Sequence, residues 1–305
     1  MDHGAEVLLR KLELAVTRRL DGILQGDHQG LVPGPGSEPG EARGYQPGDD
    51  VRRMDWNVTA RTGVAHVRTP VADRELETWV VADLSASLAF GTAACEKRDL
   101  VVAAVTAVGH LTARAGNRIG ALVVQPGSTS RIPARAGRAH LTALLHQVAR
   151  APRDDGGGAT DLGVAVTALD RLARKRGVAV VISDFVGAPG WERPLRALAA
   201  RQDTIAIEVV DPRELSLPDV GLLALVDPET GRLLEVQTSD RKVRDRFAGA
   251  AAAQRAGVAA SLRSAGADHL VLRTDRDWLL DLVSFVERRR RRRIAAPARS
   301  VTVPG

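Results

Sequence analysis

From residue 77 onward, short apolar segments alternate with longer segments in which apolar residues recur at helical spacing. Several apolar segments have the length of a buried strand and end in polar residues, as in ETWVVADLS (77–85) and GVAVVISDF (177–185). Strands that alternate with helices of ten or more residues are typical of a mainly parallel sheet with helices on both faces. The pattern therefore predicts an α/β fold with a doubly wound, mainly parallel sheet. The expected strands are 77–85, 117–124, 127–133, 177–185, 203–211 and 267–274, and the expected helices are 96–115, 138–150, 191–201, 240–265 and 276–293, with one more after the glycine-rich loop at 156–161.

The remaining segments have different patterns. Residues 5–24 show roughly helical spacing, and residues 43–75 are typical of a loop with short strands, one of them over 63–69. A hairpin is predicted over 220–238. The sequence thus divides into an N-terminal helix and PGDD-containing arm (1–76), an α/β domain (77–287) and an arginine-rich C-terminal tail (288–305).

The net charge of +6 comes from the C-terminus. The chain has 305 residues, with 43 Lys and Arg against 37 Asp and Glu. Arg288–Arg293 and Arg299 supply seven of the basic residues, which leaves 36 basic against 37 acidic residues elsewhere. A nearly neutral body argues against a domain-wide nucleic-acid surface. The tail is predicted to be a solvated charge block, with peripheral contact to an anionic membrane or to nucleic-acid phosphates as alternatives.

No segment indicates export or a membrane anchor. The N-terminus has charges within its apolar periodicity, unlike a signal peptide. The longest apolar stretch, 100–109, is shorter than the roughly 20 residues that a membrane span needs. A single cysteine, Cys95, excludes an internal disulfide. We expect a soluble, cytoplasmic protein.

Oxygen-bearing side chains fall at three strand ends or loops that the fold brings to one edge of the sheet. They lie in the segments 83–87, 160–161 and 183–184. Ligands of open α/β folds bind at the carboxyl ends of the strands, near the switch in strand order. Two carboxylates and several hydroxyls suit Mg²⁺, or a similar divalent cation such as Mn²⁺. The alternative is that these residues only cap helices and form turns.

The order of these residues resembles a known motif. In von Willebrand factor A-type domains, the metal-ion-dependent adhesion site has the pattern Asp-x-Ser-x-Ser, then Thr, then Asp. The matching residues here are Asp83, Ser85, Ser87, Thr160 and Asp184. The segments RGYQPGDDVRRMDWNVTART, VRTPVADRELE and DLSASLAFGT further resemble the bacterial domain of unknown function 58 family, from about Gly26 to Phe185. Two departures are Leu88, where many relatives have Met, and Pro39, where an aromatic residue is frequent.

The resemblance implies a metal-dependent protein-interaction module that is not an enzyme. Members of this family are often associated with MoxR-type AAA+ ATPases, and such an ATPase is the expected partner in protein assembly or maturation. The five matching residues would hold Mg²⁺, and a carboxylate from the protein partner would complete its coordination.

The enzymatic alternative is a Mg²⁺-dependent phosphohydrolase. That class needs a nucleophilic Asp and, typically, a second Asp two residues later for proton transfer, whereas position 85 is Ser. The chain also has no phosphate-binding loop of the form G-x-x-x-x-G-K-[ST] and no G-x-S-x-G motif. No spacing of its seven histidines favours a catalytic role.

The arm contains a mixed-charge segment around PGDD (47–50). We expect its charges to form ion pairs that clamp the arm, with Trp56 as an apolar anchor, since buried charges need partners. A docking surface for a partner is the alternative. The residues concerned are Asp49, Asp50, Arg52, Arg53, Asp55, Trp56, Arg61 and Arg68.

Overall fold

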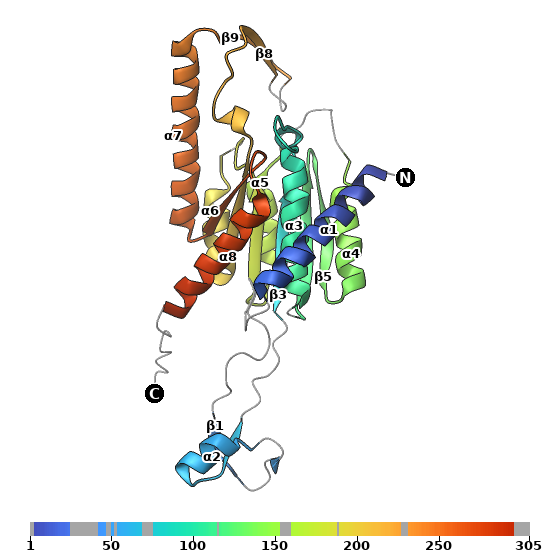
Figure 1. Ribbon diagram of the computed structural model, residues 1–305, viewed down its shortest axis with the longest axis vertical. Coiled ribbons are helices and arrows are strands. Elements are labelled where there is room, and N and C mark those ends of the chain that lie inside the picture. Colours follow the sequence, from blue (N-terminus) through green and yellow to red (C-terminus); the bar gives the residue numbers. More distant parts are fainter. Residues whose placement is uncertain are drawn as a thin grey trace.

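A six-stranded sheet forms the centre of the protein, for which we describe a computed structural model (Figure 1). The strand order is β10-β7-β6-β3-β4-β5, and every neighbouring pair is parallel except β4 and β5. The strands are β3 (Glu77–Asp83), β4 (Arg118–Gln125), β5 (Ser128–Arg135), β6 (Val178–Ser183), β7 (Asp203–Val210) and β10 (Asp268–Arg273). The predicted mainly parallel sheet is confirmed. The structure describes residues 3–24, 42–46, 50–51, 54–68, 76–114, 116–152, 160–187, 189–226 and 231–295.

Helices cover both faces of this sheet, as predicted. They are α1 (His3–Leu24), α3 (Lys97–Arg114), α4 (Arg138–Ala149), α5 (Leu162–Leu172), α6 (Glu192–Arg201), α7 (Arg241–Ala265) and α8 (Trp278–Ala295). One apolar core joins α1, α3, α4 and α8 to one face of the sheet, and a second joins α5, α6 and α7 to the other. Strand β3 contributes to both because its side chains alternate: Val80 and Ala82 lie in the first core, Trp79 and Val81 in the second.

Helix α1 shares the first core although it precedes the arm in sequence. Its residues Leu9, Leu12 and Val16 are buried there, and the helix contacts α3 and α4. The spacing of these three residues places them on one helix face. By its packing, α1 thus goes with the α/β domain.

The described part of the arm is a small unit of two strands and a helix. β1 (Ala42–Gly44) pairs antiparallel with β2 (His66–Arg68) inside the predicted strand region, and α2 (Trp56–Thr62) lies between them. The sequence predicted no helix here. α2 forms because the Asp55 carboxylate accepts hydrogen bonds from the backbone N–H groups of Asn57 and Val58.

The predicted clamp is only partly covered by the described residues. Asp49, Arg52 and Arg53 lie outside them, and the side chain of Arg68 does as well. Trp56 is 67% exposed, so it is not a buried anchor. The described part of the arm thus leaves a large aromatic ring on its surface.

The hairpin consists of β8 (Leu222–Val226) and β9 (Leu233–Gln237), which pair antiparallel as predicted. Residues 227–230, where the turn was predicted, lie outside the described part. The hairpin stands beyond the carboxyl ends of the parallel strands (Figure 1). Its exposed aliphatic side chains are those of Leu222, Val226, Leu233 and Leu234.

The arginine run lies within α8, which continues to Ala295. Arg289 is only 6% exposed. Its guanidinium donates to Asp268 at 2.6 Å and forms an ion pair with Asp203, so it joins the amino ends of β10 and β7. The prediction of a solvated block is therefore wrong for Arg289, whereas Arg291 and Arg292 are exposed. Among the described residues, no helix has the length and apolar character that crossing a membrane requires.

Candidate functional site

The strand order reverses between β3 and β6. The chain passes from β3 through α3 to β4 on one side, and later returns to place β6 on the other side of β3. Ala82 pairs in parallel register with Ile182, so the residues that follow them lie next to each other at one edge of the sheet. Those residues are Asp83 on one strand and Ser183 with Asp184 on the other. This is the switch point at which open α/β folds bind ligands.

Asp83 is a buried carboxylate, 4% exposed, whose hydrogen bonds come from neutral groups. Its Oδ1 accepts from the backbone N–H of Ser85 at 3.0 Å, and its Oδ2 accepts from the hydroxyl of Ser183 at 2.7 Å. Burial raises the pKa of Asp83 to about 6, and the nearby carboxylate of Asp184 adds to this effect. The site therefore contains a carboxylate whose ionised form lacks a compensating positive charge.

The two serines of the motif turn their hydroxyls toward each other. The distance between Ser85 Oγ and Ser87 Oγ is 3.1 Å. Ser85 stands at the N-cap of a short helical turn, η2 (Ala86–Leu88), but its side chain makes no capping hydrogen bond. The hydroxyl of Ser85 therefore does not cap this helical turn, contrary to the alternative interpretation. The two hydroxyls lie beside Asp83, which the Ser85 N–H already holds.

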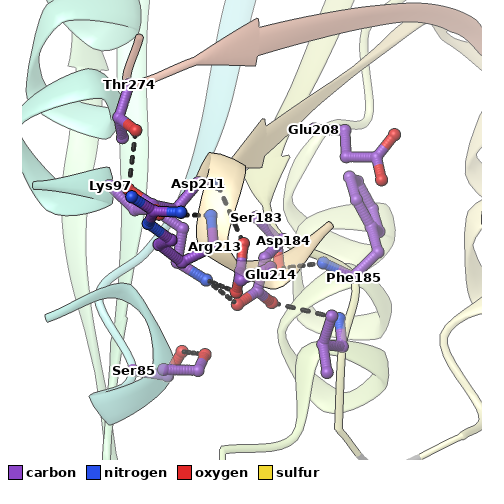
Figure 2. Close-up of polar contacts among 12 residues, drawn as sticks. Ser85, Lys97, Ser183, Asp184, Phe185, Glu208, Asp211, Arg213, Glu214 and Thr274 are labelled. Carbon is purple, nitrogen blue, oxygen red and sulfur yellow. Dashed lines mark hydrogen bonds and ion pairs between the residues drawn. The ribbon is translucent and has the colours of Figure 1, made fainter. Parts of the chain in front are cut away.

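Asp184 is as buried as Asp83 but has a cationic partner. Its Oδ2 accepts from Lys97 Nζ at 2.8 Å, and its Oδ1 accepts from the backbone N–H of Val186 at 3.0 Å (Figure 2). The Lys97 ammonium also donates to Glu214 Oε1 at 2.5 Å. Burial alone would lower the pKa of Lys97, but Asp184 and Glu214 outweigh burial and leave that pKa raised, so the ammonium stays charged.

A strained residue follows Asp184. Phe185 has φ 55°, a left-handed conformation that is uncommon for a side chain with a Cβ. Its N–H donates to Ser183 Oγ at 3.0 Å, and its ring packs against Trp191 with the ring centroids 5.1 Å apart. Such strain persists where the surroundings impose it, and it often marks functional sites. Here it directs Phe185 into the core while Asp184 stays at the edge of the sheet.

Thr160 is half-buried and lies two residues before the start of α5. Its neighbour Asp161 is the N-cap of that helix and accepts from the N–H of Val164 at 2.9 Å. Within the part of the chain that is described, Thr160 makes no hydrogen bond to the other four predicted residues. The structure therefore groups Asp83, Ser85, Ser87 and Asp184, whereas Thr160 lies on the adjoining loop.

Two residues near the site were not predicted: Lys97 and Glu214. Ser183 lies in the strand-end segment 183–184 that the sequence singled out, although it was not one of the five residues matched to the motif. Lys97 is four residues before Val101, so both lie on the buried face of α3. A charged residue on an apolar helix face could have indicated a buried ion pair. Glu214 carried no signal because its position depends on the fold after β7.

Asp211 holds Glu214 in place. It is the N-cap of η3 (Pro212–Glu214), and its backbone N–H donates to Glu214 Oε2 at 2.9 Å. Its own carboxylate accepts from the hydroxyls of Thr92 at 2.6 Å and Thr274 at 2.7 Å. These hydrogen bonds keep the pKa of Asp211 below its ordinary value although burial opposes them. The loops after β3, β7 and β10 are thereby tied together beside the site.

The donor set fits a hydrated divalent cation. Asp83, Ser85 and Ser87 offer hard oxygen atoms close together, and a cation would relieve the buried charge of Asp83. The described residues contain no cluster of three or more His, Cys, Asp or Glu side chains arranged for a metal. A cation here would accordingly be held by few carboxylates, with hydroxyls and water, which is a pattern that Mg²⁺ tolerates.

Comparisons with known proteins agree with the resemblance in the sequence. Residues 41–257 match the family described as "Protein of unknown function DUF58". The Uncharacterized protein Rv1480 of Mycobacterium tuberculosis (strain ATCC 25618 / H37Rv) is 58% identical over 294 residues, 96% of this chain and 92% of that protein. The Uncharacterized protein MAV169 of Mycobacterium avium is 52% identical over 166 residues, which cover 54% of this chain and 98% of that protein.

Solved structures with a related arrangement were also found. The conserved hypothetical protein BatB from Bacteroides thetaiotaomicron has a TM-score of 0.46 at 14% identity, covering 71% of this chain and 99% of that one. A von Willebrand factor type A protein from Catenulispora acidiphila has a TM-score of 0.36 at 12% identity, covering 74% of this chain and 43% of that one.

Proposed function

Since this chain belongs to the DUF58 family and has a von Willebrand factor A-like α/β fold, we propose that it is a metal-dependent protein-interaction module. The observation that carries the proposal is the buried, uncompensated carboxylate of Asp83 beside the paired hydroxyls of Ser85 and Ser87 at the switch point. Asp83, Ser85 and Ser87 would hold Mg²⁺ directly. Asp184 and Thr160 would contribute from the neighbouring loops, through water where they do not reach the ion.

The bound cation would supply a positive charge at the protein surface that attracts a carboxylate. The chain's own residues prepare the surface around it. Exposed apolar side chains follow each of the three site loops: Phe90 after Ser87, Val164 after Thr160 and Val186 after Asp184. Protein interfaces combine apolar contacts with a smaller number of polar ones, so exposed apolar side chains on the loops that follow the site suit contact with a partner protein. A protein that presents an Asp or Glu among apolar neighbours is the partner that fits.

We propose a MoxR-type AAA+ ATPase as that partner, with this protein as its adaptor in protein assembly or maturation in the cytoplasm. The reasoning is the family association together with a site suited to binding. Ser85 takes the place that a phosphohydrolase would give to an acid/base carboxylate, and Ser183 donates to Asp83 instead of relaying a proton. We therefore propose a binding function without turnover.

The binding of the full chain to a purified MoxR-type ATPase from the same bacterium tests this proposal. EDTA alone is ambiguous, because it also removes the Mg²⁺ that the ATPase needs with its nucleotide. The decisive comparison is wild type against Asp83→Asn, both in Mg²⁺, by biolayer interferometry. We expect the substitution to abolish binding. Asp170→Asn, which removes a carboxylate of α5 bonded to Arg201, should leave it intact. Equal binding by wild type and Asp83→Asn would refute the metal-dependent mechanism.

A further inference from the structure

Lys97 is an unusual residue for its position. Its side chain is 0% exposed, and the ammonium lies between two carboxylates, 2.8 Å from Asp184 Oδ2 and 2.5 Å from Glu214 Oε1. Burying a lysine is costly unless carboxylates compensate it, so this arrangement is a built feature of the site. Figure 2 shows Lys97 reaching from α3 toward Asp184 and Glu214.

The ammonium bonds to a residue of the candidate metal site. Asp184 is one of the two carboxylates that the motif provides, and Lys97 already neutralises it. Asp83, by contrast, accepts hydrogen bonds from neutral groups, among them the Ser85 N–H and the Ser183 hydroxyl. A cation that binds at Asp83 would therefore find the charge of Asp184 already neutralised by Lys97, and the charge of Asp83 not neutralised. It would also meet the repulsion of the lysine charge.

We propose that the Lys97 ammonium competes with the divalent cation for Asp184 and thereby sets the cation affinity of the site. This inference rests on the proposed function, since it concerns the same cation. With Lys97 on Asp184, the cation is held by Asp83 and hydroxyl oxygens. The site then binds the ion more weakly than the same residues would without the lysine.

Glu214 tunes this competition. It shares the ammonium with Asp184, and η3 holds it in place through the backbone N–H of Asp211. Without the Glu214 charge, Lys97 would interact with Asp184 alone and compete more strongly with the cation. Neutralising Lys97 and neutralising Glu214 therefore change cation affinity in opposite directions, although both remove a buried ion pair.

The experiment measures Mn²⁺ binding to the metal-free full chain from the electron paramagnetic resonance signal of the free ion. Because a unit charge is removed beside a ligand carboxylate, we expect Lys97→Met to lower the dissociation constant by about tenfold or more. Glu214→Gln should raise it. A purely structural role for Lys97 predicts weaker binding in both variants, because both lose the buried ion pair. Folded Lys97→Met with unchanged or weaker Mn²⁺ binding would overturn the inference.

A second comparison guards against misfolding of the single variant. If Lys97→Met does not fold, the pair Lys97→Met/Glu214→Gln leaves fewer uncompensated charges and is compared with Glu214→Gln alone. Tighter binding by the double variant supports the competition, and equal or weaker binding refutes it. A failure of the proposed function would give a different result, in which wild type and Asp83→Asn bind Mn²⁺ equally weakly. If wild type binds, Asp83→Asn does not, and removing Lys97 has no tightening effect, only the role of Lys97 is wrong.

Discussion

Asp83→Asn should make the metal-free protein more stable near neutral pH. The pKa of Asp83 is 3.8 in an unperturbed chain and about 6 in the folded protein. A raised pKa means that the folded state binds the proton more tightly, so the free energy of unfolding falls as the pH rises through this interval. Above it, ionised Asp83 costs the folded state about 3 kcal/mol. Asparagine has a similar shape and carries no charge.

The expected gain is smaller than this cost. Asn keeps an acceptor for the Ser85 N–H but loses the hydrogen bond that Ser183 donates to Asp83, which is worth about 1 kcal/mol. The net stabilisation at about pH 7.5 is therefore about 2 kcal/mol. At about pH 4.5 the ionisation cost falls to about 1 kcal/mol, and the gain should disappear.

Urea denaturation in EDTA at both pH values measures this difference. Mg²⁺ should then raise the stability of wild type by about 1.4 kcal/mol at ten times its dissociation constant, and leave Asp83→Asn unchanged. Asp170→Asn serves as the control, because that carboxylate is bonded to Arg201 near the surface. A loss of stability in Asp83→Asn at neutral pH, or a gain of equal size at both pH values, would refute the reasoning.

Two further predictions concern the folded scaffold. Arg289→Ala should lower the free energy of unfolding by about 2 kcal/mol, because it removes the buried guanidinium that forms ion pairs with Asp203 and Asp268. Arg291→Ala, at an exposed position, should change it by less than about 0.5 kcal/mol. Equal effects in chemical denaturation would contradict the assigned contacts. Gly177→Ala should destabilise the protein strongly, since a Cβ there would lie 2.1 Å from the carbonyl oxygen of Glu77, whereas Gly249→Ala in α7 meets open space and should stabilise by about 0.5–1 kcal/mol. The melting temperatures of the two variants should therefore move in opposite directions. A shift of both in the same direction would show that the close contact at Gly177 does not determine the stability of the alanine variant.

The periodicity of the sequence was sufficient to predict the central sheet and the helices that cover it. Buried parallel strands have continuous apolar runs, and the helices between them are long, so each element has a clear local signature. α2 had none, because its seven residues depend on one capping carboxylate, Asp55, and on no apolar stripe. The end of β5 was also predicted two residues too early, because six of its eight residues are exposed and form no apolar run.

The candidate site was predictable only where its residues are close in sequence or at strand ends. Asp83, Ser85 and Ser87 lie within five residues, and parallel pairing brings Asp184 beside them. The partners of Lys97 are 87 and 117 residues away, and no local pattern encodes such pairs. Arg289 was missed for the same reason, because its carboxylates come from distant strands. In both cases, the sequence has a charged residue where the helical spacing predicts an apolar one, and this was the only local indication.

The placement of Arg289 inside a run of identical residues affects how the gene can vary. In a helix, the loss of one residue rotates every later side chain by about 100°. Here, the loss of one arginine from Arg288–Arg293 still leaves an arginine at position 289, because the next one moves up by one place. The clamp on Asp203 and Asp268 is thus preserved. The run can therefore lose one arginine while the contacts of residue 289 with Asp203 and Asp268 are kept.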